Sequence, residues 1–152
     1  MEIRKAQKED IGGIEAIYER IHDEEERGVA TIGWIRGVYP TRATAQSALA
    51  RGDLFVLTED GRVAAAAVIN QTQVDVYKDA AWKHDAADGA VMVLHALVVD
   101  PLAKGRGLGR AFVAFYEDYA KRHGCPALRM DTNAINTRAR RLYRTLGYEE
   151  VG

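Results

Sequence analysis

Apolar residues recur at helical spacing in three segments of the chain. Between about residues 9 and 22 they share one helical face, at Ile11, Ile14, Ile17, Tyr18 and Ile21. A polar connection over 23–40 ends at Pro40, after which Thr41 can cap a second helix over about 42–51. A third helix, over about 107–123, has one apolar side made of Leu108, Phe112, Phe115, Tyr116 and Tyr119. These patterns predict amphipathic helices that pack on a shared core.

Strand patterns lie between and after these helices. Residues 2–6 predict a short first strand, and residues 54–58 and 63–70 flank a turn typical of a β-hairpin, Glu59-Asp60-Gly61-Arg62. The run 90–99 is too continuously apolar to alternate, so we expect a central strand that is covered on both faces. Residues 127–131 follow the third helix and predict a strand parallel to 91–99. The expected fold class is α/β, a mixed and mostly antiparallel sheet with helices on both faces.

Composition narrows the class of protein. With 152 residues, 47% of them hydrophobic, we expect a single domain over 1–152. A net charge of −1 gives no support to nucleic-acid binding. The lone Cys125 excludes an internal disulfide and fits a reducing cytoplasm. No apolar run reaches membrane-spanning length, and residues 1–30 are too charged for a signal peptide. We therefore expect a cytoplasmic protein with no membrane or nucleic-acid partner.

A glycine-rich basic turn joins the central strand to the third helix. Asp100-Pro101 ends the apolar run, and the turn that follows reads Lys104-Gly105-Arg106-Gly107-Leu108-Gly109-Arg110. Glycine lacks a Cβ, so the backbone can turn sharply and lie close to a ligand. The first N–H groups of the helix have no partner inside it, and they carry the positive end of the helix dipole. This arrangement is typical of a pyrophosphate-binding site, although any strand-to-helix connection can be rich in glycine.

Two nucleotide-binding alternatives fit the same turn less well. A P-loop needs Gly-Lys followed by Ser or Thr, and the chain has no such pair. A dinucleotide fingerprint needs a third glycine, but Arg110 or Phe112 stands at that position, depending on which glycine begins the motif. Asp131 lies near the distance expected for the acidic residue that binds ribose, yet too little chain follows it to complete a doubly wound sheet.

A second motif lies near the end of the chain. Residues 136–148 carry one apolar helical stripe, at residues 135, 139, 142, 143 and 146, and Gly147 can end that helix in a left-handed conformation. Together the two motifs resemble those of the GNAT superfamily of acyl-CoA N-acyltransferases, and the close match covers about 93–148. The late helix matches Asn-x-x-Ala-x-x-Leu-Tyr-x-x-x-Gly-Phe, with Tyr148 in place of the final Phe. The loop matches Arg/Gln-x-x-Gly-x-Gly/Ala, with Lys104 at the first position, which keeps the charge but loses the planar fork of arginine.

The resemblance implies an enzyme that transfers an acetyl group from acetyl-CoA, its co-substrate, to a primary amine in a ternary complex. Residues 104–110 would bind the cofactor's pyrophosphate. Backbone N–H groups at a bulge of the central strand, at Leu97, Val98 and Val99, would bind the carbonyl oxygen. No covalent acyl-enzyme is implied, and Cys125 lies on a helix-to-strand connection at the opposite edge.

Two residues of the late helix match functional positions of the family. Tyr143 matches the general acid, since a phenol with a pKa near 10 is protonated at neutral pH and can protonate a departing thiolate. Its alternative role is that of a core aromatic residue. Asn136 matches the residue that binds the pantetheine arm, and its alternative role is a helix cap.

Two residues are candidates for the general base. Asp131 ends its strand at a position where some family members carry a catalytic carboxylate, and a buried Asp could be tuned to accept a proton from the amine. His95 lies on the central strand, and the pKa of a histidine needs little change for it to act as a base near neutral pH. It could equally be a hydrogen-bonded core histidine. A chain of water molecules is the third alternative.

Other residues have weaker signals. The acidic run 23–26 could attract a cationic amine or form a solvated helix end. Four aromatic residues could line the acceptor pocket or cover the edge of the core: Trp34, Tyr39, Tyr77 and Trp82. Four arginines could help to hold the nucleotide phosphate or face solvent: Arg138, Arg140, Arg141 and Arg144. His22, His84 and His123 show no metal-ligand spacing with one another or with Cys125, so we expect no metal site.

The acceptor, a small-molecule or peptide amine, is not readable from the sequence, and two other functions compete. One is a non-catalytic acyl-CoA sensor on the same scaffold, and the other is a nicotinamide-dependent oxidoreductase. Family members continue beyond the late helix with a sixth and a final strand, whereas residues 148–152 suffice for one short strand. We therefore expect the final strand to be missing, a shallow acceptor pocket, and self-association of the exposed sheet edge as a symmetric homodimer.

Overall fold

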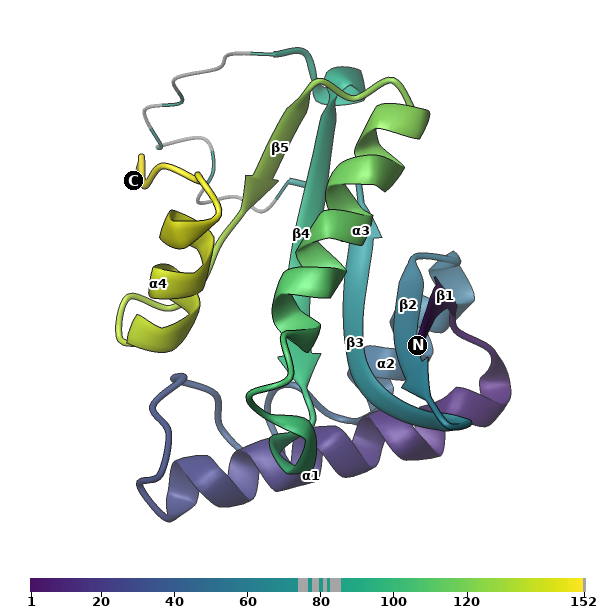
Figure 1. Cartoon of the computed structure of the whole chain (residues 1–152), viewed down its shortest axis with the longest axis vertical. Coiled ribbons are helices and arrows are strands. Elements are labelled where there is room, and N and C mark those ends of the chain that lie inside the picture. The colour runs from purple at the N-terminus through teal and green to yellow at the C-terminus, as the bar shows by residue number, and fades with distance from the viewer. Residues whose placement is uncertain (74–76, 78–79, 81, 83–85, 152) are drawn as a thin grey trace.

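A five-stranded sheet forms the centre of the molecule (Figure 1). The computed structural model describes residues 1–73, 77, 80, 82 and 86–151; His84 lies outside the described residues. The strands are β1 (Glu2–Lys5), β2 (Leu54–Glu59), β3 (Arg62–Asn70), β4 (Val91–Val99) and β5 (Ala127–Met130). They lie side by side in chain order, and all neighbours pair antiparallel except β4 and β5, which are parallel. The mixed, mostly antiparallel sheet is confirmed, and it is not the doubly wound sheet of a dinucleotide-binding fold.

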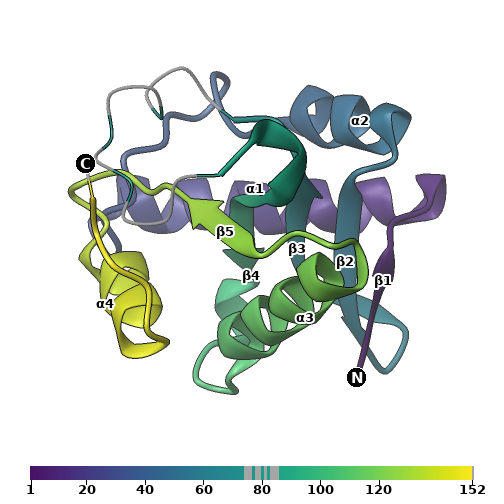
Figure 2. The same cartoon turned by 90° about the horizontal axis from the view of Figure 1, so that it is seen from above.

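Helices cover both faces of this sheet (Figure 2). The helices α1 (Ile11–Glu26) and α2 (Arg42–Arg51) lie on one face, and α3 (Leu108–Arg122) lies on the other. The helix α4 (Thr137–Thr145) follows β5 and packs on the core at the α3 side. Short 3-10 turns at Lys8–Asp10, Asp88–Ala90 and Pro101–Ala103 join larger elements within the described part of the chain. Among the described residues, no helix is long and apolar enough to cross a membrane.

Side-chain alternation in the strands divides the core into two layers. In β2, Leu54 and Val56 join the isoleucines of α1, whereas Phe55 and Leu57 join Phe112 of α3. Successive side chains of a strand point to opposite faces, so one apolar strand can supply both layers. In β4, Met92 and Leu94 likewise join the α3 layer and Val98 joins the isoleucines of α1, which confirms the expectation that the apolar run 90–99 is covered on both faces.

The strand β4 contains a β-bulge in its pairing with β3. Between two successive β3–β4 pairs, β3 contributes one residue and β4 contributes two, Ala96 and Leu97. Ala96 has a φ of +49°, in the left-handed region that few non-glycine residues adopt. The bulge inverts the alternation: Met92 and Leu94 face the α3 layer before it, and Leu97 and Val99 face that layer after it.

The strands β4 and β5 separate at one end. Their last pair is Leu94 with Met130, yet β4 continues for five further residues, from His95 to Val99. Along that edge these residues have no strand partner. The gap between the two strands is the place where a ligand can reach the backbone of β4.

One sequence-based boundary was wrong. The acidic run assigned to a polar connection is the last turn of α1, which ends at Glu26. Residues 148–151, which have the length of a short strand, form none, so β5 is an edge strand of the described sheet.

Candidate active site

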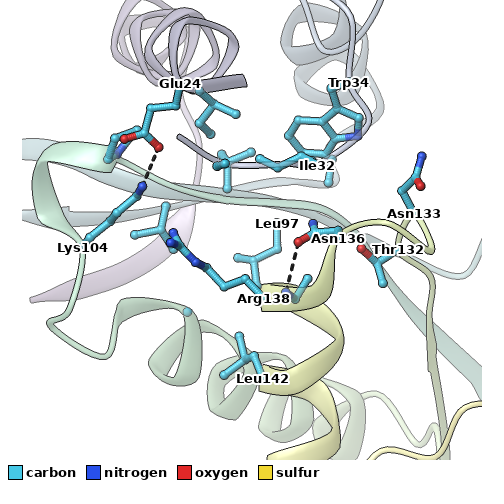
Figure 3. Close-up of a pocket in the computed structure, with 18 of the residues that line it drawn as sticks. Glu24, Ile32, Trp34, Leu97, Lys104, Thr132, Asn133, Asn136, Arg138 and Leu142 are labelled. Carbon is cyan, nitrogen blue, oxygen red and sulfur yellow. Dashed lines mark hydrogen bonds and ion pairs between the residues drawn. The ribbon is translucent and has the colours of Figure 1, made fainter. Parts of the chain in front are cut away.

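A cleft of about 1120 Å³ opens where β4 and β5 separate. One wall is the exposed edge of β4, and another is the N-terminal half of α4 with the preceding residues 131–133. The turn between β4 and α3 closes one end, and residues 29–34 with Tyr39 form the wall opposite α4 (Figure 3). In Figure 3, Arg138 and Leu142 belong to α4, and Ile32 and Trp34 lie across the cleft from them. All the elements named in the two sequence motifs therefore meet in one cavity.

The N-terminus of α3 opens into this cleft without a side-chain cap. Its first residue is preceded by Gly107 with a φ of +74°, and Gly105 has a φ of +78°. An added Cβ would meet no atom within 4 Å at either glycine. The positive φ of the backbone, and not a lack of space, is therefore what favours glycine at these two positions. The N–H of Ala111 bonds the carbonyl of Gly107 at 3.0 Å, which is the first helical hydrogen bond. The three N–H groups before it are available to an anion.

The start of this turn is fixed by a buried carboxylate. Asp100 is 6% exposed and accepts hydrogen bonds from the guanidinium of Arg20 on α1 at 3.0 and 2.8 Å. It also accepts one from the N–H of Leu102 at 2.9 Å. A bidentate arginine contact holds its partner in both position and orientation. The glycine-rich turn is therefore held to the rigid body of the domain.

Two of the basic residues of the turn have partners within the protein. Lys104 pairs with Glu24 of α1, and Arg106 pairs with Glu59 at 2.8 Å. Arg110 and Arg138 line the cleft, as Lys104 does, but neither arginine forms an ion pair with another described residue. Arg110 and, on α4, Arg138 are therefore the cleft residues whose positive charge no described partner neutralises. Lys104 serves chiefly to hold α1 and the turn together.

Gly109 differs from the other two glycines. It has a helical φ, and a Cβ there would lie 3.3 Å from Leu142 Cδ2 and 3.8 Å from Val99 Cγ2. The absence of a side chain at Gly109 lets α3 approach α4 and β4. A substitution at Gly109 would therefore disturb packing as well as any contact with a ligand.

On α4, Asn136 and Tyr143 both line the cleft. Asn136 precedes the helix, and its Oδ1 accepts a hydrogen bond from the N–H of Ala139 at 3.1 Å. The capping role is therefore present, and the amide NH₂ group of the same side chain remains able to donate. Burial, and to a lesser extent the charge of Asp131, raises the pKa of Tyr143 to about 12. Its phenol thus keeps its proton throughout the physiological range.

The bulge of β4 places its backbone along the cleft. Leu97, Val98 and Val99 all line it, as the family resemblance implied for the carbonyl-binding positions. Ala96, which creates the bulge and also lines the cleft, was not predicted. Nothing in the sequence marks this position, because alanine has no preference for a positive φ.

His95 lies directly before the bulge and lines the cleft. Its Nε2 lies 2.8 Å from Oδ1 of Asn70. The amide of Asn70 donates to Asp53 Oδ2 at 2.7 Å, so Oδ1 is the acceptor and Nε2 carries the proton. This chain of contacts favours the tautomer whose free lone pair is on Nδ1. Burial lowers the pKa of His95, so the ring is neutral at pH 7.

Asp131 follows β5 and also lines the cleft. The phenol of Tyr77 donates to its Oδ1 at 2.8 Å. Asp131 is exposed, so it lacks the burial that could tune a base, and the hydroxyl that it binds belongs to a buried tyrosine. No described residue forms an ion pair with it.

The acidic run at the end of α1 contacts the segment that forms one wall of the cleft. Asp23 and Glu26 pair with Arg36, and Glu25 Oε1 accepts hydrogen bonds from the N–H groups of Ile32 and Gly33 at 2.8 and 3.0 Å. These contacts fix residues 29–36 against α1. The acidic run is thus a helix end, with Asp23 and Glu26 exposed, and its carboxylates also position the wall of the cleft. Its attraction for a cationic amine stays a prediction.

Gly33 brings this wall against the residues that follow β5. It has a φ of +93°, and a Cβ there would lie 2.3 Å from Nδ2 of Asn133. Trp34 and Tyr39 form an edge-to-face pair, with ring centroids 5.8 Å apart, and both line the cleft. Trp82 does not line it and lies over Arg129, whose guanidinium carbon is 3.9 Å from the ring centroid.

The remaining basic and metal-ligand candidates lie elsewhere. Arg140 and Arg144 pair with Glu150, and Arg141 is exposed outside the cleft. Cys125 is buried at the start of β5. Within the part of the chain that the structure describes, no group of three or more His, Cys, Asp or Glu side chains could hold a metal ion.

Comparison with known proteins identifies the scaffold around this cleft. The sequence profile of the Acetyltransferase (GNAT) family matches residues 14–148. The chain belongs to the GNAT family. This membership confirms the resemblance seen in the two motifs and assigns the chain to acetyltransferases rather than to oxidoreductases.

The similar proteins include antibiotic-modifying and uncharacterised acetyltransferases. The chain is 28% identical over 79 residues to the aminoglycoside N(6')-acetyltransferase type 1 of Salmonella typhimurium, a match that covers 49% of this chain and 54% of that enzyme. It is 37% identical over 60 residues to an uncharacterised N-acetyltransferase of Bacillus subtilis, covering 40% of each chain. The matched segments span about half or less of the length of these relatives.

Solved structures share the whole fold. A GNAT-family acetyltransferase of Streptococcus agalactiae has a TM-score of 0.84 at 25% identity, covering 99% of this chain and 86% of that one. An aminoglycoside 6'-N-acetyltransferase of Acinetobacter haemolyticus has a TM-score of 0.67 at 18% identity, covering 100% and 93%. An aminoglycoside N-acetyltransferase solved in complex with CoA has a TM-score of 0.64 at 20% identity, covering 99% and 93%. The latter two show the fold alone.

Proposed function

We propose that this protein is an acetyl-CoA-dependent N-acetyltransferase that acts on a primary amine. The observation that carries the proposal is the junction of the open β4 edge with the uncapped N-terminus of α3. Members of the GNAT family use acetyl-CoA, and the residues present fit that molecule. Left-handed glycines and free helical N–H groups suit its pyrophosphate, and Arg110 and Arg138 add positive charge. Asn136 can bond the pantetheine amides.

The backbone of β4 would stabilise the charge that develops during transfer. When bound, acetyl-CoA supplies an activated thioester carbonyl. N–H groups between Leu97 and Val99 that point away from β3 can donate to its oxygen as negative charge accumulates there. Because the bulge fixes these donors before the reaction, little reorganisation is needed as the charge appears.

Tyr143 would protonate the departing thiolate. Its phenol is neutral in the cleft, because burial raises its pKa to about 12. A protonated donor is required at the moment when the C–S bond breaks. Tyr143 also packs against Tyr148, with ring centroids 6.3 Å apart, which limits the directions in which its hydroxyl can point.

His95 is the base that the geometry favours. It is neutral, it lies beside the bulge, and its tautomer leaves Nδ1 unprotonated. A neutral imidazole can accept a proton from the amine directly or through water. Asp131 is less suited to this role because one of its oxygens already holds the hydroxyl of Tyr77.

The test is the release of free thiol from acetyl-CoA in the presence of a panel of primary amines. An enzyme releases thiol with at least one amine at a rate well above hydrolysis in its absence. The alternative, a non-catalytic sensor, keeps the cleft and would bind acetyl-CoA in a calorimetric titration without releasing thiol for any amine. Failure to bind acetyl-CoA would overturn both functions.

A further inference from the structure

The charged residues that line the cleft are segregated along it. Arg110 and Arg138 lie near the N-terminus of α3, where an anion fits. Glu24 and Lys104 neutralise each other. Asp131 is the one charged residue that remains among the described lining residues, and it is acidic. The cleft is therefore positive at one end and carries a single unneutralised carboxylate elsewhere.

Asp131 and His95 lie on the same side of the sheet. In β5, Leu128 and Met130 face the α3 layer, whereas Ala127 faces the opposite layer with Tyr77. Asp131 points to the same face of the sheet as Ala127, as its hydrogen bond from Tyr77 shows. In β4, His95 precedes the bulge and follows the alternation of Val91 and Val93, which also face Tyr77. Both groups are therefore on the face opposite α3, away from the helix N-terminus that fits the phosphates.

The surroundings of Asp131 suit a cation. The negative charge of Asp131 contributes to the raised pKa values of Tyr39, Tyr77 and Tyr143, so all three phenols lie within its electrostatic reach and stay neutral. The Tyr77 hydroxyl occupies Oδ1, which leaves Oδ2 for another donor. A carboxylate beside aromatic rings is a favourable environment for an ammonium group.

A fixed carboxylate does not suit the amine that reacts. The attacking nitrogen must be uncharged, and a nearby carboxylate favours the charged ammonium form. A group that keeps its positive charge throughout the reaction gains from the same contact. The neutral ring of His95, beside the bulge, is the better neighbour for the reacting nitrogen.

We propose that Asp131 binds a second cationic group of the acceptor, one that is not acetylated, so that the acceptor is a diamine or polyamine. This inference rests on the proposed function and names the substrate class of the same cleft. Tyr77 is then a positioning residue that holds the carboxylate through Oδ1. Tyr39, paired edge-to-face with Trp34, forms an aromatic wall of the same compartment.

The experiment compares 1,4-diaminobutane with n-pentylamine, which replaces one ammonium with a methyl group at the same chain length. For the unmodified protein, kcat/KM is expected to be about 10- to 100-fold higher for the diamine, as for a hydrogen bond between charged groups. In Asp131→Asn, which keeps an oxygen for Tyr77, the diamine should fall to the level of the monoamine. The activity toward the monoamine, which lacks the second ammonium group, should fall much less than the activity toward the diamine. Asp118→Asn, on the exposed face of α3, removes the same charge away from the cleft and should preserve the preference.

Two outcomes would overturn the proposal. One is the absence of any diamine preference in the unmodified protein. The other is a loss of kcat in Asp131→Asn that is equal for both amines, which would identify Asp131 as the base. If no amine releases thiol, the proposed function fails, and calorimetric binding of 1,4-diaminobutane to the CoA-saturated protein decides this inference separately. Binding that is lost in Asp131→Asn and kept in Asp118→Asn supports it, and equal binding to both variants refutes it.

Discussion

Replacing Gly107 with alanine separates the role of this residue in binding from its role in folding. Gly107 has a φ of +74° and no atom within 4 Å of an added Cβ. The left-handed conformation costs an alanine about 1–2 kcal/mol. Alanine also has less conformational freedom than glycine in the unfolded chain, and this smaller entropy loss on folding offsets about 0.4–1 kcal/mol of that cost. We therefore expect Gly107→Ala to lower the free energy of unfolding by about 1 kcal/mol, which corresponds to a fall in Tm of about 3 °C for a chain of this size.

Gly52 provides a matched control. It ends α2 with a φ of +78°, has the same open space around its Cβ position and does not line the cleft. Gly52→Ala should therefore cost the same stability. Only Gly107→Ala adds a methyl group beside the N–H groups at the start of α3. The loss of one hydrogen bond to a charged phosphate costs about 1.5–3 kcal/mol of binding free energy, which corresponds to a reduction in acetyl-CoA affinity of about 10- to 100-fold.

The assay is calorimetric titration of acetyl-CoA into both variants, together with thermal unfolding of each. The reasoning predicts equal losses of stability and unequal losses of affinity. Equal affinities in the two variants would show that the start of α3 is not the phosphate site. A much larger stability loss in Gly107→Ala would show that the backbone there is restrained by more than its φ.

Three further expectations concern the acid, the base and the sheet edge. Tyr143→Phe should lower kcat by about 100-fold with little change in acetyl-CoA affinity; an unchanged kcat in an assay limited by chemistry would leave Tyr143 a packing residue. Because burial lowers the pKa of His95, kcat/KM should be level through neutral pH and fall only at a pH below the ordinary histidine value of about 6.5. A fall with a midpoint above pH 7, or a fall that persists in His95→Gln, would exclude His95 as the base. Since β5 is an edge strand of the described sheet, we expect a homodimer in light scattering across a dilution series, and a monomer at every concentration would contradict this.

The sequence predicted most of the fold because each element buries one apolar face. The isoleucines of α1 and the aromatic residues of α3 gave helical patterns that the structure confirms, with strands close to the expected bounds. The last turn of α1 was missed because it has no apolar pattern. Its acidic residues are held by distant partners such as Arg36 and Lys104, and helical periodicity contains no information about them.

The candidate site was predicted where it depends on local motifs and missed where it depends on contacts across the fold. The free N-terminus of α3 and the cap at Asn136 follow from short stretches of sequence. The contact between Tyr77 and Asp131 joins residues 54 positions apart, and the bulge at Ala96 arises from the register with β3. Neither has a local signature, because tertiary pairing decides both.

The bulge also separates the role of β4 in the core from its role in the cleft. Ala96 is the extra residue in the pairing with β3, so a deletion of this one residue would let the strand pair regularly and would leave Leu97 and Val99 facing the α3 layer. The apolar core would be kept, whereas the irregular backbone beside the cleft would be lost. Inserting a further residue would instead damage the core, because a shift of one position turns Leu97 and Val99 toward the opposite face.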